Sequence, residues 1–289
     1  MKILIIGNGF IATAIIQRLQ NEGHDLLVYS RTSKRNIQCK QVIGDIFEFN
    51  NFTEVLSWSP QVIIHTAWVT SHDAYKEDPT NFQYAQFTID LGRYVSHSDV
   101  EHLVVLGTCA EYGFQKGPSS AGVTTVNPNN LYGKQKVFAL NSIREFFQDS
   151  AVRLSWARIF YPYGPNQDTK RLLPYLIDSL KNGYPIELSD TSSVFDWIST
   201  RDVASAISWV IKHETPTEID VGTGMGFTNV ELLGHLEELL GISKQSRMFT
   251  TKSDSSRFVS LAGGDSPLFK SGWVPGDSLV SGLEWILSS

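Results

Sequence analysis

Short apolar segments alternate along the chain with longer segments in which apolar residues recur at every third or fourth position. Most of the short segments are continuously apolar, which is typical of parallel strands buried on both faces of a sheet. The strands predicted in this way are Lys2–Ile6, Asp25–Ser30, Val42–Ile43, Val62–Thr66, His102–Gly107, Arg153–Ile159 and Glu218–Val221. The helices predicted between them are Ala12–Glu22, Phe52–Trp58, Phe82–His97, Tyr132–Phe147 and Val203–Lys212. Such alternation predicts an α/β fold with a doubly wound parallel sheet.

The pattern changes after Pro165, where the connecting segments become richer in glycine, serine and proline. The helices predicted beyond this point are Arg171–Lys181, Asn229–Leu240 and Leu279–Leu287, and the segment from Ser253 to Trp273 is expected to be irregular. Residues 1–165, rejoined by about 194–224, are predicted to form the sheet domain. Residues 166–193 and 225–289 are predicted to form a smaller C-terminal α/β domain over the carboxyl ends of the strands, where open α/β sheets bind ligands.

The composition is that of an ordinary globular protein, with 42 % apolar and 19 % charged residues in a chain of 289. The net charge of −6 argues against nucleic acid as the main partner, because phosphate backbones select basic surfaces. Cys39 and Cys109 allow at most one disulfide, and no segment is apolar for long enough to cross a membrane. No histidines stand at a metal-ligand spacing that a helix or ribbon would support. We therefore expect a cytoplasmic protein with no metal site and no membrane partner.

A glycine-rich turn follows the first strand. The sequence Gly7-Asn8-Gly9-Phe10-Ile11-Ala12 has the form G-x-G-x-x-A between a strand and a helix. Gly7 permits the tight turn, Gly9 lets the backbone approach a pyrophosphate, and the helix N-terminus offers N–H groups to the anion. The alternative is a glycine turn without a ligand, but its place in a strand–helix–strand unit favours a Rossmann-type dinucleotide site. The expected cofactor contacts in this turn are Gly7, Gly9, Phe10 and Ile11. The substrate is expected to bind in the smaller domain.

The end of the second strand bears on the choice of cofactor. NAD enzymes place an acidic residue there to hold the ribose 2′-OH, whereas this chain has Ser30-Arg31-Thr32-Ser33-Lys34-Arg35. Hydroxyl and guanidinium groups suit a 2′-phosphate, so the sequence favours NADP over NAD, with Ser30 and Arg31 as the contacts. The alternative is a solvated basic loop.

Further cofactor contacts are expected at the ends of the next two strands. Asp45 and Ile46 follow the third strand and are expected to flank the adenine. Thr66 and Ala67 end the fourth strand, where small side chains would let the cofactor lie across the sheet. Trp68 comes next and is expected to line the substrate site beside the nicotinamide.

Three residues have the chemistry of proton transfer to or from a carbinol. Tyr132 and Lys136 are four residues apart at the start of a helix and so lie on one face, and Thr108 follows the strand His102–Gly107. An ammonium near a phenol lowers its pKa from about 10 towards neutrality, and such a phenol can exchange a proton while a hydride moves to or from nicotinamide. The hydroxyl of Thr108 would hold the same substrate oxygen. The alternative is a helix face exposed to solvent.

Taken together, these segments resemble the extended short-chain dehydrogenases/reductases of the nucleotide-sugar epimerase/dehydratase family. The matching segments are Gly7–Ala12, Gly44-Asp45, His65-Thr66-Ala67, Thr108-Cys109-Ala110-Glu111-Tyr112-Gly113, Tyr132-Gly133-Lys134-Gln135-Lys136, Tyr161-Pro162-Tyr163-Gly164-Pro165, Asp196-Trp197-Ile198, Asp202-Val203-Ala204, Val221-Gly222-Thr223-Gly224 and Gly272-Trp273-Val274-Pro275. The resemblance implies that Thr108, Tyr132 and Lys136 are catalytic. It further implies that Tyr132, Lys136 and Tyr161 contact a bound dinucleotide, and that the substrate is a nucleotide diphosphate sugar. It also implies a homodimer joined through the helices Phe82–His97 and Tyr132–Phe147.

Departures from the family pattern narrow the expected chemistry. The 4,6-dehydratases follow the threonine with an Asp-Glu pair, and here those places hold Cys109 and Ala110. Glu111 is one position further on and is expected to point to the other face of an extended segment, so dehydration is disfavoured. Phe195 stands where the family often has an arginine that grips the diphosphate. The cations expected to hold the substrate are Arg257, which matches a later arginine of the family, with Lys170 and Arg171.

Three functions are consistent with these residues. The leading one is reduction of the 4-keto group of a nucleotide-activated deoxysugar by NADPH, with Tyr132 as the proton donor. The second is a 4-epimerase that uses the same residues but keeps its cofactor bound. Ser30 and Arg31 favour the reductase, because they suit NADP and so a released co-substrate. The third, a sensor that binds NADP without chemistry, is disfavoured by the intact set of Thr108, Tyr132 and Lys136.

Overall fold

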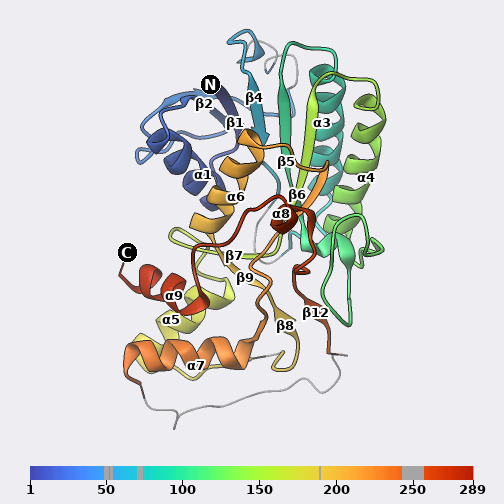
Figure 1. Cartoon of the computed structure of the whole chain (residues 1–289). Helices are drawn as coiled ribbons and strands as arrows, with labels where there is room; N and C mark the ends of the chain where they lie inside the picture. Colours follow the sequence, from blue (N-terminus) through green and yellow to red (C-terminus); the bar gives the residue numbers. More distant parts are fainter. Residues whose placement is uncertain (49–51, 53–54, 70–73, 189, 243–256, 289) are drawn as a thin grey trace.

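A seven-stranded parallel sheet forms the centre of the protein (Figure 1). This computed structural model describes residues 1–289 except 49–51, 53–54, 70–73, 189, 243–256 and 289. The strands are β1 (Lys2–Ile6), β2 (Asp25–Ser30), β3 (Lys40–Ile43), β4 (Val62–His65), β5 (His102–Thr108), β6 (Arg153–Ile159) and β10 (Glu218–Val221). Their order across the sheet is β10-β6-β5-β4-β1-β2-β3, and every pair is parallel. The order reverses beside β1, which is where doubly wound sheets open a crevice for a ligand.

Helices cover both faces of the sheet. The helices α1 (Phe10–Asn21) and α6 (Thr200–Lys212) pack side by side on one face, and α3 (Thr80–Val95) and α4 (Leu131–Phe146) on the other (Figure 1). Successive side chains of a strand point to opposite faces, so Ile3 and Ile5 join the core under α1 and α6. Leu4 and Ile6 join the core under α3 and α4. Burial on both faces explains why β1 is apolar at every position after Lys2.

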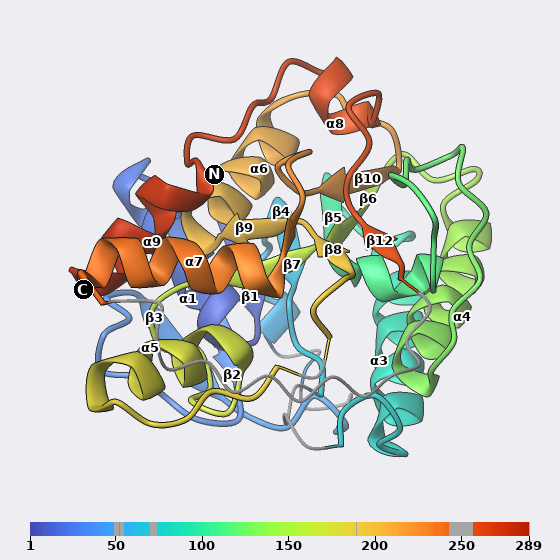
Figure 2. The same ribbon diagram turned by 90° about the horizontal axis from the view of Figure 1, so that it is seen from below.

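A smaller group of elements lies beyond the carboxyl ends of the strands, at the bottom of Figure 1 and seen from below in Figure 2. Its helices are α5 (Leu172–Asn182), α7 (Asn229–Leu240) and α9 (Leu279–Leu287), and its three-stranded sheet has the order β11 (Phe227–Thr228), β8 (Val194–Phe195) and β12 (Val259–Ser260). Leu176, Leu232, Leu236 and Leu283 are fully buried in an apolar cluster of its own. A capping box between Thr228 and Glu231 sets the start of α7.

Short elements connect the two parts. The strands β7 (Tyr161–Tyr163) and β9 (Trp197–Ser199) pair in parallel, and the 3₁₀ helix η1 (Cys109–Tyr112) directly follows β5. The short helix α8 (Pro267–Lys270) and β12 interrupt the tail, whose described part is otherwise irregular as predicted.

The predicted order of strands and long helices is confirmed, with shifts at their ends. The strand β3 begins at Lys40, β4 ends at His65 and β5 extends to Thr108. The first helix begins at Phe10, two residues before the predicted Ala12, because Gly9 is its N-cap. The predicted helix Phe52–Trp58 lies partly outside the described residues. Cys39 and Cys109 are both free thiols. No helix among the described residues is long and apolar enough to cross a membrane.

Candidate active site

The glycine-rich turn has the geometry of an anion site. Gly7 has a φ of +103°, and a Cβ atom there would lie 2.5 Å from Oγ1 of Thr66, so only glycine fits. A Cβ atom at Gly9 would meet nothing within 4 Å, so the approach to the start of α1 is open. No side chain caps the first turn of α1, which leaves its N–H groups to bind an anion. Phe10 and Ile11 are half-buried in that first turn. These features fit a dinucleotide pyrophosphate.

The loop after β2 lies beside this turn. Nδ2 of Asn8 and Oγ of Ser30 both donate hydrogen bonds to the Thr32 carbonyl oxygen, at 2.5 and 2.8 Å. Ser30 is only 6 % exposed, whereas Arg31 is exposed. Burial raises the pKa of Tyr84 in α3, and the charge of Arg31 partly offsets this, so Arg31 faces the start of α3. Of the two predicted 2′-phosphate contacts, Arg31 has the accessible side chain.

The other predicted cofactor contacts surround the same edge of the sheet. The Tyr29 hydroxyl donates to the Asp45 carbonyl oxygen at 3.1 Å, and the Thr66 hydroxyl donates to the Ile6 carbonyl oxygen at 2.8 Å. Asp45, Thr66 and Ala67 are half-buried there. Ile46 is 5 % exposed because its side chain belongs to the core under α3 and α4. These cofactor roles remain predictions.

Thr108 and Tyr132 meet at the carboxyl end of β5. The Thr108 hydroxyl accepts the Ala110 N–H at 3.2 Å and so caps η1. Gly133 brings α4 against η1, since a Cβ atom there would lie 2.7 Å from the Ala110 carbonyl oxygen. Burial raises the pKa of the Tyr132 phenol, Tyr75 raises it further, and the Thr108 hydroxyl lowers it. The expectation of a phenol pKa lowered towards neutrality is therefore wrong for this structure, because burial outweighs the opposing contacts.

Lys136 is held beneath an indole ring. It is 3 % exposed, and its Nζ atom donates to the Leu106 carbonyl oxygen at 2.5 Å and lies 3.7 Å from the centre of the Trp68 ring. Burial lowers the pKa of Lys136 to about 7, and the charge of Glu111 opposes that lowering. The Leu106 carbonyl oxygen and the face of the Trp68 ring thus fix the position of the ammonium, one turn of α4 away from Tyr132.

Aromatic rings enclose Tyr132. Trp68 and Tyr75 contact it edge-on, with ring centres 6.3 and 5.2 Å away, and the indole N–H of Trp68 donates to Asn81 at 2.7 Å. The guanidinium of Arg171 lies 4.8 Å from the centre of the Tyr75 ring. Of the two predicted substrate residues, Trp68 therefore contacts Tyr132 directly, and Arg171 is connected to it through Tyr75. The part played by Tyr75 was not predicted, since nothing in the local sequence indicates it.

An aromatic cluster forms where β7, β8 and the start of β12 lie together. Tyr161 packs edge-on against Phe195, with ring centres 4.7 Å apart, and Phe258 also packs edge-on against Phe195, at 5.5 Å. Arg257 precedes Phe258 and is exposed, as is Lys170, so neither side chain is enclosed by the site. Burial raises the pKa of Cys109 to about 12, so its thiol stays protonated at neutral pH and is a poor nucleophile.

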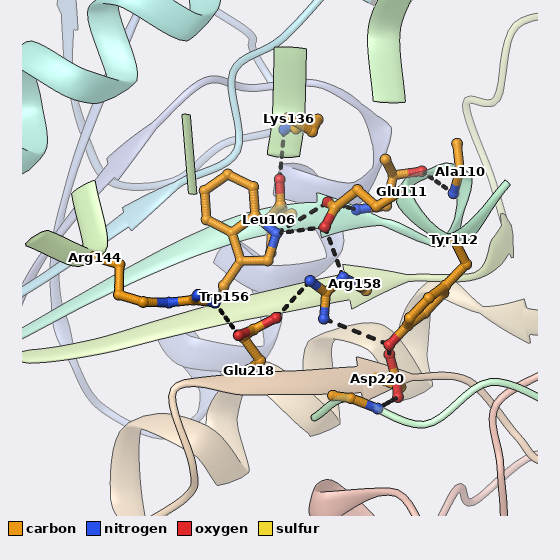
Figure 3. Close-up of polar contacts among 12 residues, drawn as sticks. Leu106, Ala110, Glu111, Tyr112, Lys136, Arg144, Trp156, Arg158, Glu218 and Asp220 are labelled. Atoms are coloured by element: carbon orange, nitrogen blue, oxygen red, sulfur yellow. Dashed lines mark hydrogen bonds and ion pairs between the residues drawn. The ribbon is translucent and has the colours of Figure 1, made fainter. Parts of the chain in front are cut away.

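Glu111 differs from its prediction. Residues 109–112 form the helix η1 rather than an extended segment, because the Thr108 hydroxyl caps it. Glu111 is fully buried and pairs with Arg158 at 2.6 Å (Figure 3). The expectation of an extended segment at Glu111 was therefore wrong. Among the described residues no group of three or more His, Cys, Asp or Glu side chains could hold a metal ion.

Comparisons with known proteins place this site in context. A family model described as the NAD dependent epimerase/dehydratase family matches residues 3–222. A UDP-glucose 4-epimerase from Rhizobium leguminosarum bv. trifolii is 24 % identical over 302 residues, covering 94 % of this chain and 92 % of that protein. A dTDP-6-deoxy-L-talose 4-dehydrogenase (NAD(+)) from Aggregatibacter actinomycetemcomitans is 24 % identical over 217 residues, covering 72 % and 78 %.

The fold is also shared with solved structures. A UDP-glucose 4-epimerase from Thermotoga maritima, crystallised with UDP-glucose, superposes with a TM-score of 0.87 at 21 % identity, covering 100 % of this chain and 98 % of the other. The prediction of a Rossmann-type sheet with a smaller second part is thereby confirmed. The boundaries proposed for two domains remain a prediction.

Proposed function

The chain belongs to the NAD-dependent epimerase/dehydratase family of extended short-chain dehydrogenases/reductases and is an enzyme, and we propose that it reduces the 4-keto group of a nucleotide-activated deoxysugar. The observation that carries this proposal is the meeting of Thr108 and Tyr132 at the end of β5, with Lys136 one helical turn away. All three lie at the same edge of the sheet as the open glycine turn.

The raised pKa of Tyr132 supports the reductive direction. A phenol whose pKa lies above its usual value is protonated at neutral pH and can act as an acid. A bound reduced dinucleotide would supply the hydride for the ketone carbon and would itself be left oxidised. Tyr132 would give its proton to the ketone oxygen, while the Thr108 hydroxyl holds that oxygen by a hydrogen bond. Lys136 would hold the cofactor ribose and stabilise the phenolate that remains.

NADP is the cofactor that we propose, through Arg31. Residues 31–35, which directly follow β2, include no carboxylate to repel a 2′-phosphate, and the Arg31 side chain is exposed. The dehydrogenase relative is named for NAD(+), so NAD is the alternative. The proposed substrate is a nucleotide diphosphate sugar, held by Arg171 beside Tyr75 and by the exposed Arg257 and Lys170.

A 4-epimerase is the second candidate, favoured by the named activity of the 24 % identical relative from Rhizobium. The two reactions differ in how much cofactor they consume, because reduction oxidises one dinucleotide per sugar whereas epimerisation leaves the dinucleotide unchanged after each turnover. Incubation with UDP- and dTDP-linked 4-keto and 4-hydroxy sugars, monitored by NADPH absorbance and by product chromatography, separates them. NADPH loss equal to product formed supports the reductase, and a changed sugar without NADPH loss supports the epimerase.

We further propose a cytoplasmic homodimer joined through α3 and α4. Phe82 and Tyr94 of α3 are 55 % and 43 % exposed, and Phe138 of α4 is 54 % exposed. Large apolar side chains exposed on two adjacent helices are a feature of association surfaces. A molar mass equal to that of one protomer, measured by light scattering at micromolar protein concentration, would contradict the dimer.

A further inference from the structure

Glu111 lies inside the protein with both carboxylate oxygens bonded (Figure 3). Its Oε1 atom accepts the Thr108 main-chain N–H at 2.9 Å and the Trp156 indole N–H at 2.9 Å. Its Oε2 atom accepts Nε of Arg158 at 2.6 Å. Its side chain is fully buried, so each of these bonds is made away from water. One carboxylate thus connects β5, η1 and β6.

One of these bonds is made to Thr108 of the proposed site, and another is made to Trp156, which lies beside Lys136. The Thr108 N–H belongs to the residue whose hydroxyl meets Tyr132, so the bond fixes the backbone from which that hydroxyl projects. The Trp156 ring centre lies 5.8 Å from Nζ of Lys136, so its indole forms part of the wall around the ammonium. Glu111 therefore contacts the supports of both Thr108 and Lys136 without being at the surface of the site.

Gly107 keeps the space that this arrangement needs. A Cβ atom at Gly107 would lie 2.3 Å from Nε1 of Trp156 and 2.7 Å from Oε1 of Glu111. Any larger residue would push the carboxylate and the indole apart. The close approach of Glu111 and Trp156 thus depends on a glycine one residue before Thr108.

Arg158 holds Glu111 in place from the other side. Its guanidinium is 1 % exposed and also contacts Glu218 at 2.5 Å, and Glu218 pairs in turn with the partly exposed Arg144. A buried charge is tolerated when it is paired and hydrogen-bonded, and here the pairing continues to the surface. The carboxylate of Glu111 consequently has one well-defined position.

We propose that Glu111 is a positioning residue for the reaction: it sets the place of the Thr108 hydroxyl through the Thr108 N–H and the place of the Lys136 ammonium through the Trp156 indole. The inference rests on the proposed function. The negative charge of Glu111 also favours the charged form of Lys136, which burial disfavours. A displacement of about 1 Å in such a support can cost about 100-fold in rate.

The test compares Glu111→Gln with Glu218→Gln, because both changes remove a carboxylate from Arg158 but only the first touches the Thr108 turn. Turnover of a 4-keto sugar nucleotide, the KM for that sugar, the Kd for NADPH and the melting temperature are measured for each. We expect Glu111→Gln to lower kcat by about 10- to 100-fold, with KM and Kd changed by less than about threefold. Glu218→Gln should keep kcat within about twofold of the unmodified enzyme, even if its melting temperature falls as far as that of Glu111→Gln.

A kcat for Glu111→Gln within about threefold of the kcat for Glu218→Gln would overturn the inference, whether or not both values fall below that of the unmodified enzyme. If Glu111→Gln does not fold, Glu111→Gln/Arg158→Gln removes both buried charges and leaves Glu218 with Arg144, and the same kcat comparison applies. Absence of turnover by the unmodified enzyme would instead contradict the proposed function, and this inference with it.

Discussion

The ammonium of Lys136 lies 3.7 Å from the centre of the Trp68 ring. A cation placed over an indole face is stabilised by the electrons of the ring, and the Leu106 carbonyl oxygen adds a hydrogen bond. Burial nevertheless lowers the pKa of Lys136 to about 7. The site therefore keeps its lysine close to the point at which it gains or loses a proton.

This relationship predicts how stability depends on pH. Between about pH 7 and 10.5 the unfolded chain keeps the Lys136 proton and the folded protein loses it, so the free energy of unfolding gains a contribution that rises with pH. Lys136→Met abolishes that contribution, and so the wild type should gain stability relative to this variant between pH 7 and pH 9.5 in urea unfolding. The exposed Lys134→Met is the matched control. A wild-type advantage that is the same at both pH values would contradict the burial of a titrating ammonium.

Glu22 predicts a second pH dependence, at the contact of α1 with α6. Burial alone would raise the pKa of Glu22, but hydrogen bonds from Lys212, Ser208 and Arg18 lower it from 4.5 to about 2. A lowered carboxyl pKa contributes stability above the unfolded value, which is lost as the pH falls from about 4.5 to about 2.

Glu22→Gln tests this contribution. It should lower the free energy of unfolding by about 1 kcal/mol at pH 7, the scale of a partly exposed charge-assisted contact. The deficit should shrink as the pH is lowered from 5 towards 2.5. The exposed Glu187→Gln serves as control, and a deficit for Glu22→Gln that stays constant with pH would count against the assignment.

Arg31 is expected to decide the cofactor. Arg31→Ala should weaken NADPH binding by about 1.5–3 kcal/mol and leave NADH nearly unchanged, because the guanidinium would contact the 2′-phosphate that NADH lacks. Fluorescence titration of both dinucleotides measures this, with Arg35→Ala from the same exposed loop as control. Equal affinity of the wild type for NADH and NADPH would show that the assignment of Ser30 and Arg31 is wrong.

The sequence predicted those parts of the molecule that local pattern determines. The bounds of β1, β2, β6 and β10 were predicted correctly: β1 and β2 from apolar runs buried on both faces, and β6 and β10 from patterns in which apolar and polar residues largely alternate. The glycine turn and the Tyr132–Lys136 spacing are likewise local. The two-residue strands β8, β11 and β12 were missed, because they exist only through pairing with one another.

The remaining features depend on distant partners. The orientation of Glu111 is set by Arg158, which lies 47 residues further along the chain. The pKa of Tyr132 depends on its burial among Tyr75 and other side chains. The four-residue spacing correctly predicted that Tyr132 and Lys136 lie on one helix face, but it predicted a lowered pKa for Tyr132 where burial raises it. Tyr75 contacts Tyr132 and Arg171 from a loop with no periodicity of its own.

The measurement that tests the account most directly is the turnover of Tyr132→Phe. This change removes the transferable proton and keeps the ring, so the contacts with Trp68 and Tyr75 are retained. The variant should bind NADPH within about threefold of the wild type, and its kcat on the 4-keto sugar nucleotide should fall by about 10²–10⁴-fold, the usual contribution of a positioned acid. Tyr184→Phe, at a tyrosine that is 59 % exposed, should retain the wild-type kcat. Turnover of Tyr132→Phe within about threefold of the wild type would contradict the catalytic role of Thr108, Tyr132 and Lys136.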